Sequence, residues 1–123
     1  MTQQPKRTGP YAGYDSLEEA VEGLRRARFR VASTFRVERR GLVVEGNILE
    51  GAVRAGMVLL PVLERYDNIY MPLAIDSVEV VRHTGGAESI ALVIHSAPRE
   101  QPNLASGTIV DVLERAPGGL ISA

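Results

Sequence analysis

The sequence predicts a small, mainly β protein with one helix near its N-terminus. At residue 29 the apolar pattern changes to a period of two, with Phe29, Val31, Phe35 and Val37 on one face, which is the period of a half-buried strand. Only Leu17–Leu24 keeps the apolar period of a helix. A chain of 123 residues is expected to form one domain. Because an all-β chain must hide its strand edges, six or so short strands predict a closed β-barrel or a sandwich.

The predicted helix spans residues 15–28. Asp15 or Ser16 can cap its first turn, and a glutamate three residues later completes a capping box. One face of the helix is apolar, and we expect it to close one end of the barrel, with pairing against a second copy as the alternative. Residues 1–14 are rich in proline and glycine and are predicted to be a flexible tail. The apolar face consists of Leu17, Ala20, Val21 and Leu24.

The barrel domain is expected over residues 29–115, followed by a C-terminal tail over 116–123 that can dock on a partner. Turn residues separate the predicted strands. Pro61 and Pro72 fall inside strand patterns and cannot donate to a ladder, so each marks an edge or a bulge. The strands are Phe29–Val37, Leu42–Leu49, Met57–Arg65, Ile69–Arg82 (with a break), Ser89–Ser96 and Thr108–Leu113.

Composition excludes several classes of function. Fourteen basic and fifteen acidic residues exclude a uniformly basic nucleic-acid coat. The absence of cysteine excludes disulfides, thiolate catalysis and cysteine-bound zinc. The longest apolar run, Met57–Leu63, is far shorter than the roughly 20 residues of a membrane span. With no secretory signal at the start of the sequence, a cytoplasmic location is the default expectation.

Four glycines stand five residues apart: Gly41, Gly46, Gly51 and Gly56. Because five is odd, successive glycines in one strand point to opposite faces and cannot form a single stripe. We interpret them as structural glycines. Gly41 is expected to open a strand, Gly46 to allow a bend or a close backbone approach, and the last two to lie at tight corners.

The stretch Arg40–Gly56, which reads RGLVVEGNILEGAVRAG, resembles the second domain of translational GTPases such as elongation factor Tu. Two later segments, Gly86–Leu92 and Leu104–Ile109, resemble strands near the end of that domain. The resemblance covers residues 34–113. It implies a closed barrel of six or seven strands that contacts RNA or a neighbouring GTPase domain. Here Met57 stands where the family commonly has an acidic residue.

The chain has no GxxxxGK[ST] loop, so it lacks the backbone nest and lysine that hold nucleotide phosphates. The resemblance therefore implies a barrel that stands alone, without the GTPase domain, and serves for binding. No nucleotide or other cofactor is expected.

Charge is unevenly distributed. Residues 1–54 hold ten bases and seven acids, a balance of +3, whereas residues 55–123 hold four bases and eight acids, a balance of −4. Seven arginines crowd the predicted helix end and the first strand, and they can meet phosphates if they converge in space. The alternative is a solvated face interleaved with glutamates. These candidate RNA- or partner-binding residues are Arg25, Arg26, Arg28, Arg30, Arg36, Arg39 and Arg40.

No motif predicts catalysis or a metal site. His83 and His95 have no partner at triad or metal-ligand spacing, so both are interpreted as structural. We therefore predict a non-catalytic binding or adaptor module for RNA, a ribonucleoprotein or a GTPase. The first alternative is a structural or oligomerising domain that uses the helix stripe or the edges near Pro61 and Pro72. The second is an enzyme with a cleft near the two histidines.

Overall fold

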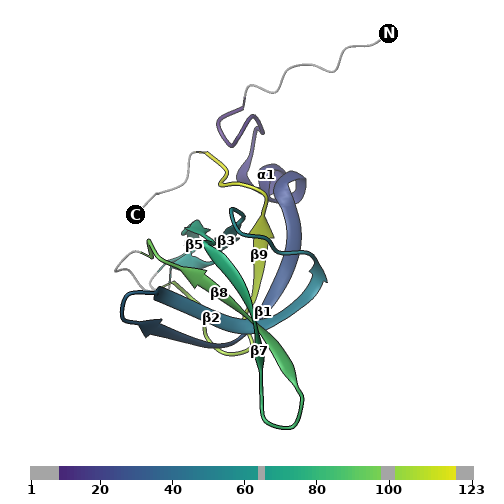
Figure 1. The fold of residues 1–123 in the computed structure, drawn as a ribbon. Coiled ribbons are helices and arrows are strands. Elements are labelled where there is room, and N and C mark those ends of the chain that lie inside the picture. The colour runs from purple at the N-terminus through teal and green to yellow at the C-terminus, as the bar shows by residue number, and fades with distance from the viewer. Residues whose placement is uncertain (1–8, 64–65, 98–101, 119–123) are drawn as a thin grey trace.

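The computed structural model describes residues 9–63, 66–97 and 102–118 and shows a mainly β fold with one short helix (Figure 1). Helix α1 spans Leu17–Leu24, and its N-cap Ser16 accepts a hydrogen bond from the backbone N–H of Glu19 at 3.1 Å. The expected extension of the helix to residue 28 is wrong. Residues 25–28 are extended because they pair with the last strand, and this pairing buries Ala27 in the core.

Nine strands follow helix α1 in the described part of the chain, and turns separate the longer strands. Pro61 lies between two of these strands, as its missing N–H donor requires, and Pro72 lies in the gap between two others. The strands are β1 (Arg25–Val37), β2 (Gly41–Gly51), β3 (Val58–Leu60), β4 (Val62–Leu63), β5 (Tyr66–Tyr70), β6 (Leu73–Ala74), β7 (Ser77–Arg82), β8 (Glu88–Ile94) and β9 (Ile109–Leu113).

Seven strands form one antiparallel sheet in the order β6-β3-β9-β1-β2-β8-β7, and β4 pairs with β5 in a separate hairpin. The sheet curls strongly, but the expected closed barrel is wrong, because the edge strands β6 and β7 do not pair with each other. Ile75 and Asp76 join these two edges along the chain. The Ile75 N–H donates to the carbonyl of Met57, just before β3, and the Asp76 N–H donates to the carbonyl of Val93 in β8. Ile75 is therefore bonded on the β6 side of the opening and Asp76 on the β7 side. The result is an open, curled half-barrel.

Buried apolar side chains form a main cluster inside the curl of the sheet. A second, smaller cluster lies at one end of it. Strands β1, β2, β8 and β9 bury alternate side chains there, with Phe29, Val44 and Leu92 fully enclosed. Helix α1 covers the end near β9, where Leu24 packs in the same cluster as Leu113. Burial within the chain therefore accounts for Ala20 and Leu24 of the helix stripe, whereas Leu17 and Val21 are only partly buried. The second cluster consists of Ala20, Leu24, Leu60 and Leu113.

The segment before the helix contributes to the fold from residue 9. Gly9–Tyr14 folds back on itself through two short bridges, and Tyr14 packs beside the helix cluster. Pro117, after the last strand, is also fully buried. Parts of both predicted tails thus belong to the structured domain, while residues 1–8 and 119–123 of those tails lie outside the described residues.

Three of the four regularly spaced glycines bring backbones unusually close together, and one of them, Gly51 at the end of β2, has its Cβ position 2.0 Å from the Arg26 carbonyl oxygen. Gly46 lies inside β2, where a Cβ atom would be only 1.9 Å from the Arg30 carbonyl oxygen of β1. Gly41 opens β2 with a φ of 88° and lies against the backbone of Ile94. A side chain at any of these positions would push neighbouring strands apart. The β1–β2 ladder is irregular at this point, with a register shift between Val31 and Ser33.

Candidate binding site

The seven candidate arginines separate into three groups along β1 and the β1–β2 turn. Those at the junction of α1 and β1 are neutralised by acidic partners. Arg25 lies 2.9 Å from Asp111 and Arg26 lies 2.7 Å from Glu114. Arg28 reaches Glu50 at 3.4 Å. These three arginines therefore lie in a mixed-charge surface rather than in a basic patch.

The partners of Arg25 also affect its protonation. Partial burial opposes the charged form, but the hydrogen bond and the attraction from Asp111, with a further contribution from Glu22, raise the pKa of Arg25 above its ordinary value. The guanidinium thus remains charged and links the start of β1 to β9. Its role in this structure is to hold two elements together.

Arg30 stands by itself in the middle of β1. It is exposed and lies opposite Asn47 on β2 and Ile109 on β9. Among the described residues no acidic side chain pairs with it. Because Arg36 follows six residues later along an extended strand, Arg30 is about 20 Å from the third group.

The third group converges at the tip of the β1–β2 hairpin. Arg36, Arg39 and Arg40 line one cavity of about 460 Å³, together with Gly41 and, from the end of β8, His95. The pairing of β2 with β8 brings His95 to this place, since Leu42 lies opposite Ile94. Residues that are 55 positions apart in the sequence thus meet around one basic hollow.

Arg39 occupies a conformation that L-residues rarely adopt. Its φ is 69°, in the left-handed region, at the third position of the turn that the Arg40 N–H closes on the Val37 carbonyl. Glycine adopts this geometry at lower cost, because the Cβ atom of an L-residue destabilises it by about 1 kcal/mol. The turn therefore carries an exposed arginine where glycine would fold more easily.

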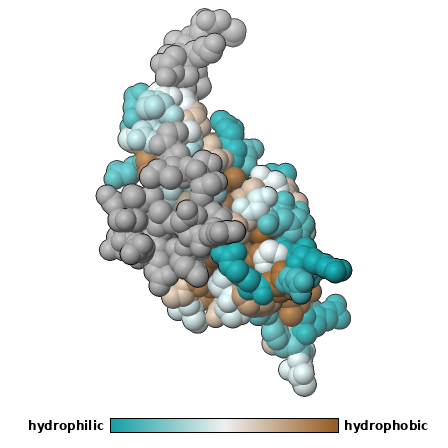
Figure 2. All heavy atoms as spheres, turned by 90° about the vertical axis from the view of Figure 1, so that its left-hand side faces the viewer, coloured by the Kyte–Doolittle hydropathy of each residue, from teal (hydrophilic) through white to brown (hydrophobic). Residues whose placement is uncertain are grey.

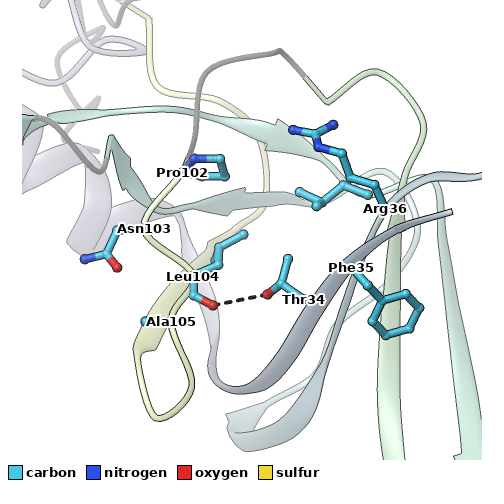
Figure 3. Close-up of a pocket in the computed structure, with 8 residues that line it drawn as sticks. Thr34, Phe35, Arg36, Pro102, Asn103, Leu104 and Ala105 are labelled. Carbon is cyan, nitrogen blue, oxygen red and sulfur yellow. Dashed lines mark hydrogen bonds between the residues drawn. The ribbon is translucent and has the colours of Figure 1, made fainter.

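A second cavity, of about 350 Å³, adjoins the first through Arg36 (Figure 3). Thr34 and Arg36 face the segment Pro102–Ala105, and the Thr34 hydroxyl donates a hydrogen bond to the Leu104 carbonyl at 3.1 Å. The neighbouring Phe35 ring turns to the opposite side of the strand and is 47% exposed. Polar groups therefore flank Arg36 on this side of the strand, whereas the Phe35 ring lies on the other side.

Acidic side chains also lie at this end of the sheet. Glu38 lines the cavity, and Arg40 forms an ion pair with Glu79 of β7. Asp76 accepts a hydrogen bond from the His95 backbone N–H at 2.6 Å. Glu38, Asp76 and the ion pair between Arg40 and Glu79 offset much of the positive charge at this end of the sheet, which limits the hollow to a small number of anionic contacts.

Sequence reasoning missed a polar cluster on the outer face of the same sheet. Glu45 of β2 accepts hydrogen bonds from Ser89 at 2.6 Å and from Ser33 at 3.1 Å, and His83 Nε2 lies 3.0 Å from the same carboxylate. The hydrogen bond from Ser89 is the largest influence and, against partial burial, lowers the pKa of Glu45. Nothing in the sequence indicates this cluster, because only the strand register brings its members together.

This cluster contains a serine, a histidine and a glutamate, yet its geometry differs from that of a catalytic triad. The Ser89 hydroxyl donates to Glu45 Oε1, and His83 Nε2 faces both of these oxygens at 2.9 and 3.0 Å. In a catalytic triad the serine hydroxyl donates to the histidine, whereas here Ser89 donates its hydrogen bond to the glutamate. The arrangement links β2 to β8 and to the end of β7.

No known protein family, curated protein or solved structure matches this chain in sequence or fold comparisons. Within residues 9–63, 66–97 and 102–118 no group of three or more metal-ligating side chains is present. The helix in that part of the chain is also too short and too polar to cross a membrane. The geometry of the hairpin thus remains the main guide to function.

Proposed function

We propose that this chain is a non-catalytic binding module whose β1–β2 hairpin contacts the phosphates of an RNA. The observation that carries the proposal is the convergence of Arg36, Arg39 and Arg40 on one hollow with His95. Guanidinium groups are the side chains best suited to phosphate, because their planar fork presents several N–H donors at once. A site of this size suits one or two phosphates of a backbone.

Two further features support this function. Arg39 keeps a cation at a position where glycine would cost less backbone strain, as is typical of a residue retained for contact with a ligand. Phe35 is half exposed on the other side of β1 from Arg36, and there it offers a surface on which a base can stack (Figure 3). The resemblance to the second domain of translational GTPases adds support and goes with a cytoplasmic location.

The experiment measures binding of a short fluorescent oligouridine over a salt series by anisotropy. We expect a log–log salt slope of about −0.7 to −1.4, since each neutralised phosphate of a single strand contributes about −0.7. The variant Arg39→Gly should weaken binding at low salt and make the slope shallower by about 0.7, which is the contribution of one phosphate contact. Its thermal stability should rise, because glycine relieves the left-handed strain by about 1 kcal/mol.

The matched control is Arg54→Ala, which removes the same charge from an exposed position in the turn after β2, at the other end of that strand. It should leave both the affinity and the slope unchanged. Equal losses in Arg39→Gly and Arg54→Ala, or binding that does not depend on salt, would contradict a specific site at the hairpin. The simultaneous gain in stability excludes misfolding as the cause of lost binding.

A further inference from the structure

Strand β7 forms an open edge of the curled sheet. It pairs with β8 on one side only, and the β7–β8 hairpin projects from the body of the molecule (Figure 1 and Figure 2). The His83 N–H donates to the Ala87 carbonyl at 2.8 Å, so the pairs 83/87, 81/89 and 79/91 exchange hydrogen bonds across the hairpin. The backbone groups of Val78, Val80 and Arg82 therefore face away from β8, toward the open side.

The middle of this edge is apolar and exposed. Val80 has 59% of its surface accessible, the largest exposed fraction among the large hydrophobic residues in the described part of the chain. Natural sheets protect an open edge with lysine, proline or a bulge. Strand β7 has no lysine, proline or bulge, since its register with β8 runs without interruption from Ser77 to Arg82. Its two charged residues, Glu79 and Arg82, form ion pairs within the same chain.

We propose that β7 pairs in antiparallel fashion with β7 of a second copy of this chain, with Val80 opposite Val80. Only residues whose N–H and C=O face the open side can exchange hydrogen bonds with the second copy. This leaves two symmetric registers in which most of the strand is paired. One of them places Glu79 opposite its own copy, and like charges directly opposite each other are unfavourable. The other places Val80 at the two-fold axis, where its free N–H and C=O meet those of its copy.

The register centred on Val80 is self-complementary along the strand. Val78 lies opposite Arg82 of the other copy, whose aliphatic stem can cover it, and Glu79 lies opposite Val81. No pair of like charges faces across the new ladder. Because each chain contributes seven strands, the two half-barrels join into one sheet of fourteen (7 + 7). The contact is isologous and closes as a dimer.

The chain contains no cysteine, so a single introduced cysteine reports the register directly. In Val80→Cys the two Cα atoms would lie about 5.5 Å apart, which is within the range of a disulfide. We expect a disulfide-linked dimer under mild oxidation at micromolar protein. The matched control is Ile109→Cys, which is 51% exposed but lies on β9, between two neighbouring strands. It should cross-link at least about tenfold more slowly.

Sedimentation of the wild-type chain over a concentration series provides the second measurement. A reversible monomer–dimer equilibrium is expected, and Val80→Lys should weaken it about tenfold or more by placing two ammonium groups opposite each other. A wild-type chain that remains monomeric at the highest concentration, or equal cross-linking of the two cysteine variants, overturns the proposal. RNA binding is not required for either result, so the two proposals fail independently.

Discussion

Residue chemistry alone could identify the arginines but not their partners. The crowding of seven arginines near the first strand is visible in the sequence, whereas Asp111 and Glu114, which neutralise two of them, are more than 80 positions away. Only the pairing of β1 with β9 brings these acids within reach. The sequence therefore overestimated the basic surface, and the structure reduces it to the hairpin tip.

The Glu45 cluster leads to a prediction at the residue scale. Replacing Ser89 with alanine removes the shortest hydrogen bond to the carboxylate and should lower the free energy of unfolding at neutral pH by about 1 to 2 kcal/mol. Because folding lowers the pKa of Glu45, its stabilising contribution is present above the ordinary value of 4.5 and is lost as the pH falls through the folded value. The variant should therefore lose less stability on acidification than the wild type.

Urea denaturation at several pH values between about 3 and 7 measures this effect, since the difference between the two proteins is expected to shrink toward the acid end. Ser106→Ala, in an exposed turn before β9, is the matched control and should follow the wild type at every pH. A difference between Ser89→Ala and wild type that stays constant with pH would show that the hydroxyl does not act through the Glu45 carboxylate.

At the scale of elements, the sequence predicted most strands because alternating apolar residues, as in β1, or short apolar runs bounded by turn residues, as in β3 and β8, mark them. The longest exception is the segment Ile69–Arg82, expected as one strand with a break, which contains the end of β5, β6 and β7. The segment Met57–Arg65 divides at Pro61, because proline has no N–H to donate to a ladder. The last two residues of this segment lie outside the described residues. Helix length was overestimated because pairing of residues 25–28 with β9 outweighs their local propensity for helix.

Gly46 provides the test of the close approach between β1 and β2. Gly46→Ala would place a methyl group 1.9 Å from the Arg30 carbonyl oxygen and 2.9 Å from the Phe29 ring, so the two longest strands must separate locally. We expect a loss of about 3 kcal/mol or more in the free energy of unfolding. A chemical denaturation curve, compared with the wild type, measures it.

Gly56→Ala is the control for this substitution. Gly56 has a φ of 94° but nothing within 4 Å of the position that a Cβ would take, so only backbone strain of about 1 kcal/mol is expected. Similar losses in the two variants would mean that steric contact across the β1–β2 ladder does not distinguish Gly46 from an ordinary turn glycine.

At the scale of the whole molecule, the sequence could indicate a curled sheet but not whether it closes. Closure depends on hydrogen bonds between β6 and β7, which are separated by only Ile75 and Asp76 along the chain. Both linking residues donate to the strands on their own sides. The local sequence carries no signal for this choice, since it is decided by where the two edges lie in space.

The open sheet predicts a distinct pattern of amide hydrogen exchange. Amides of Val44 and Leu92, within strands that have neighbours on both sides, should exchange only through global unfolding. Along β7 protection should alternate: the Val81 N–H faces β8 and exchanges slowly, whereas the Val80 N–H faces the open side and exchanges fast in dilute solution. Equal protection of these two amides at high dilution would mean that the chain itself covers the edge. Protection of Val80 that appears only as the protein concentration rises is the result that a second copy on this edge requires, because its own backbone then occupies the free N–H.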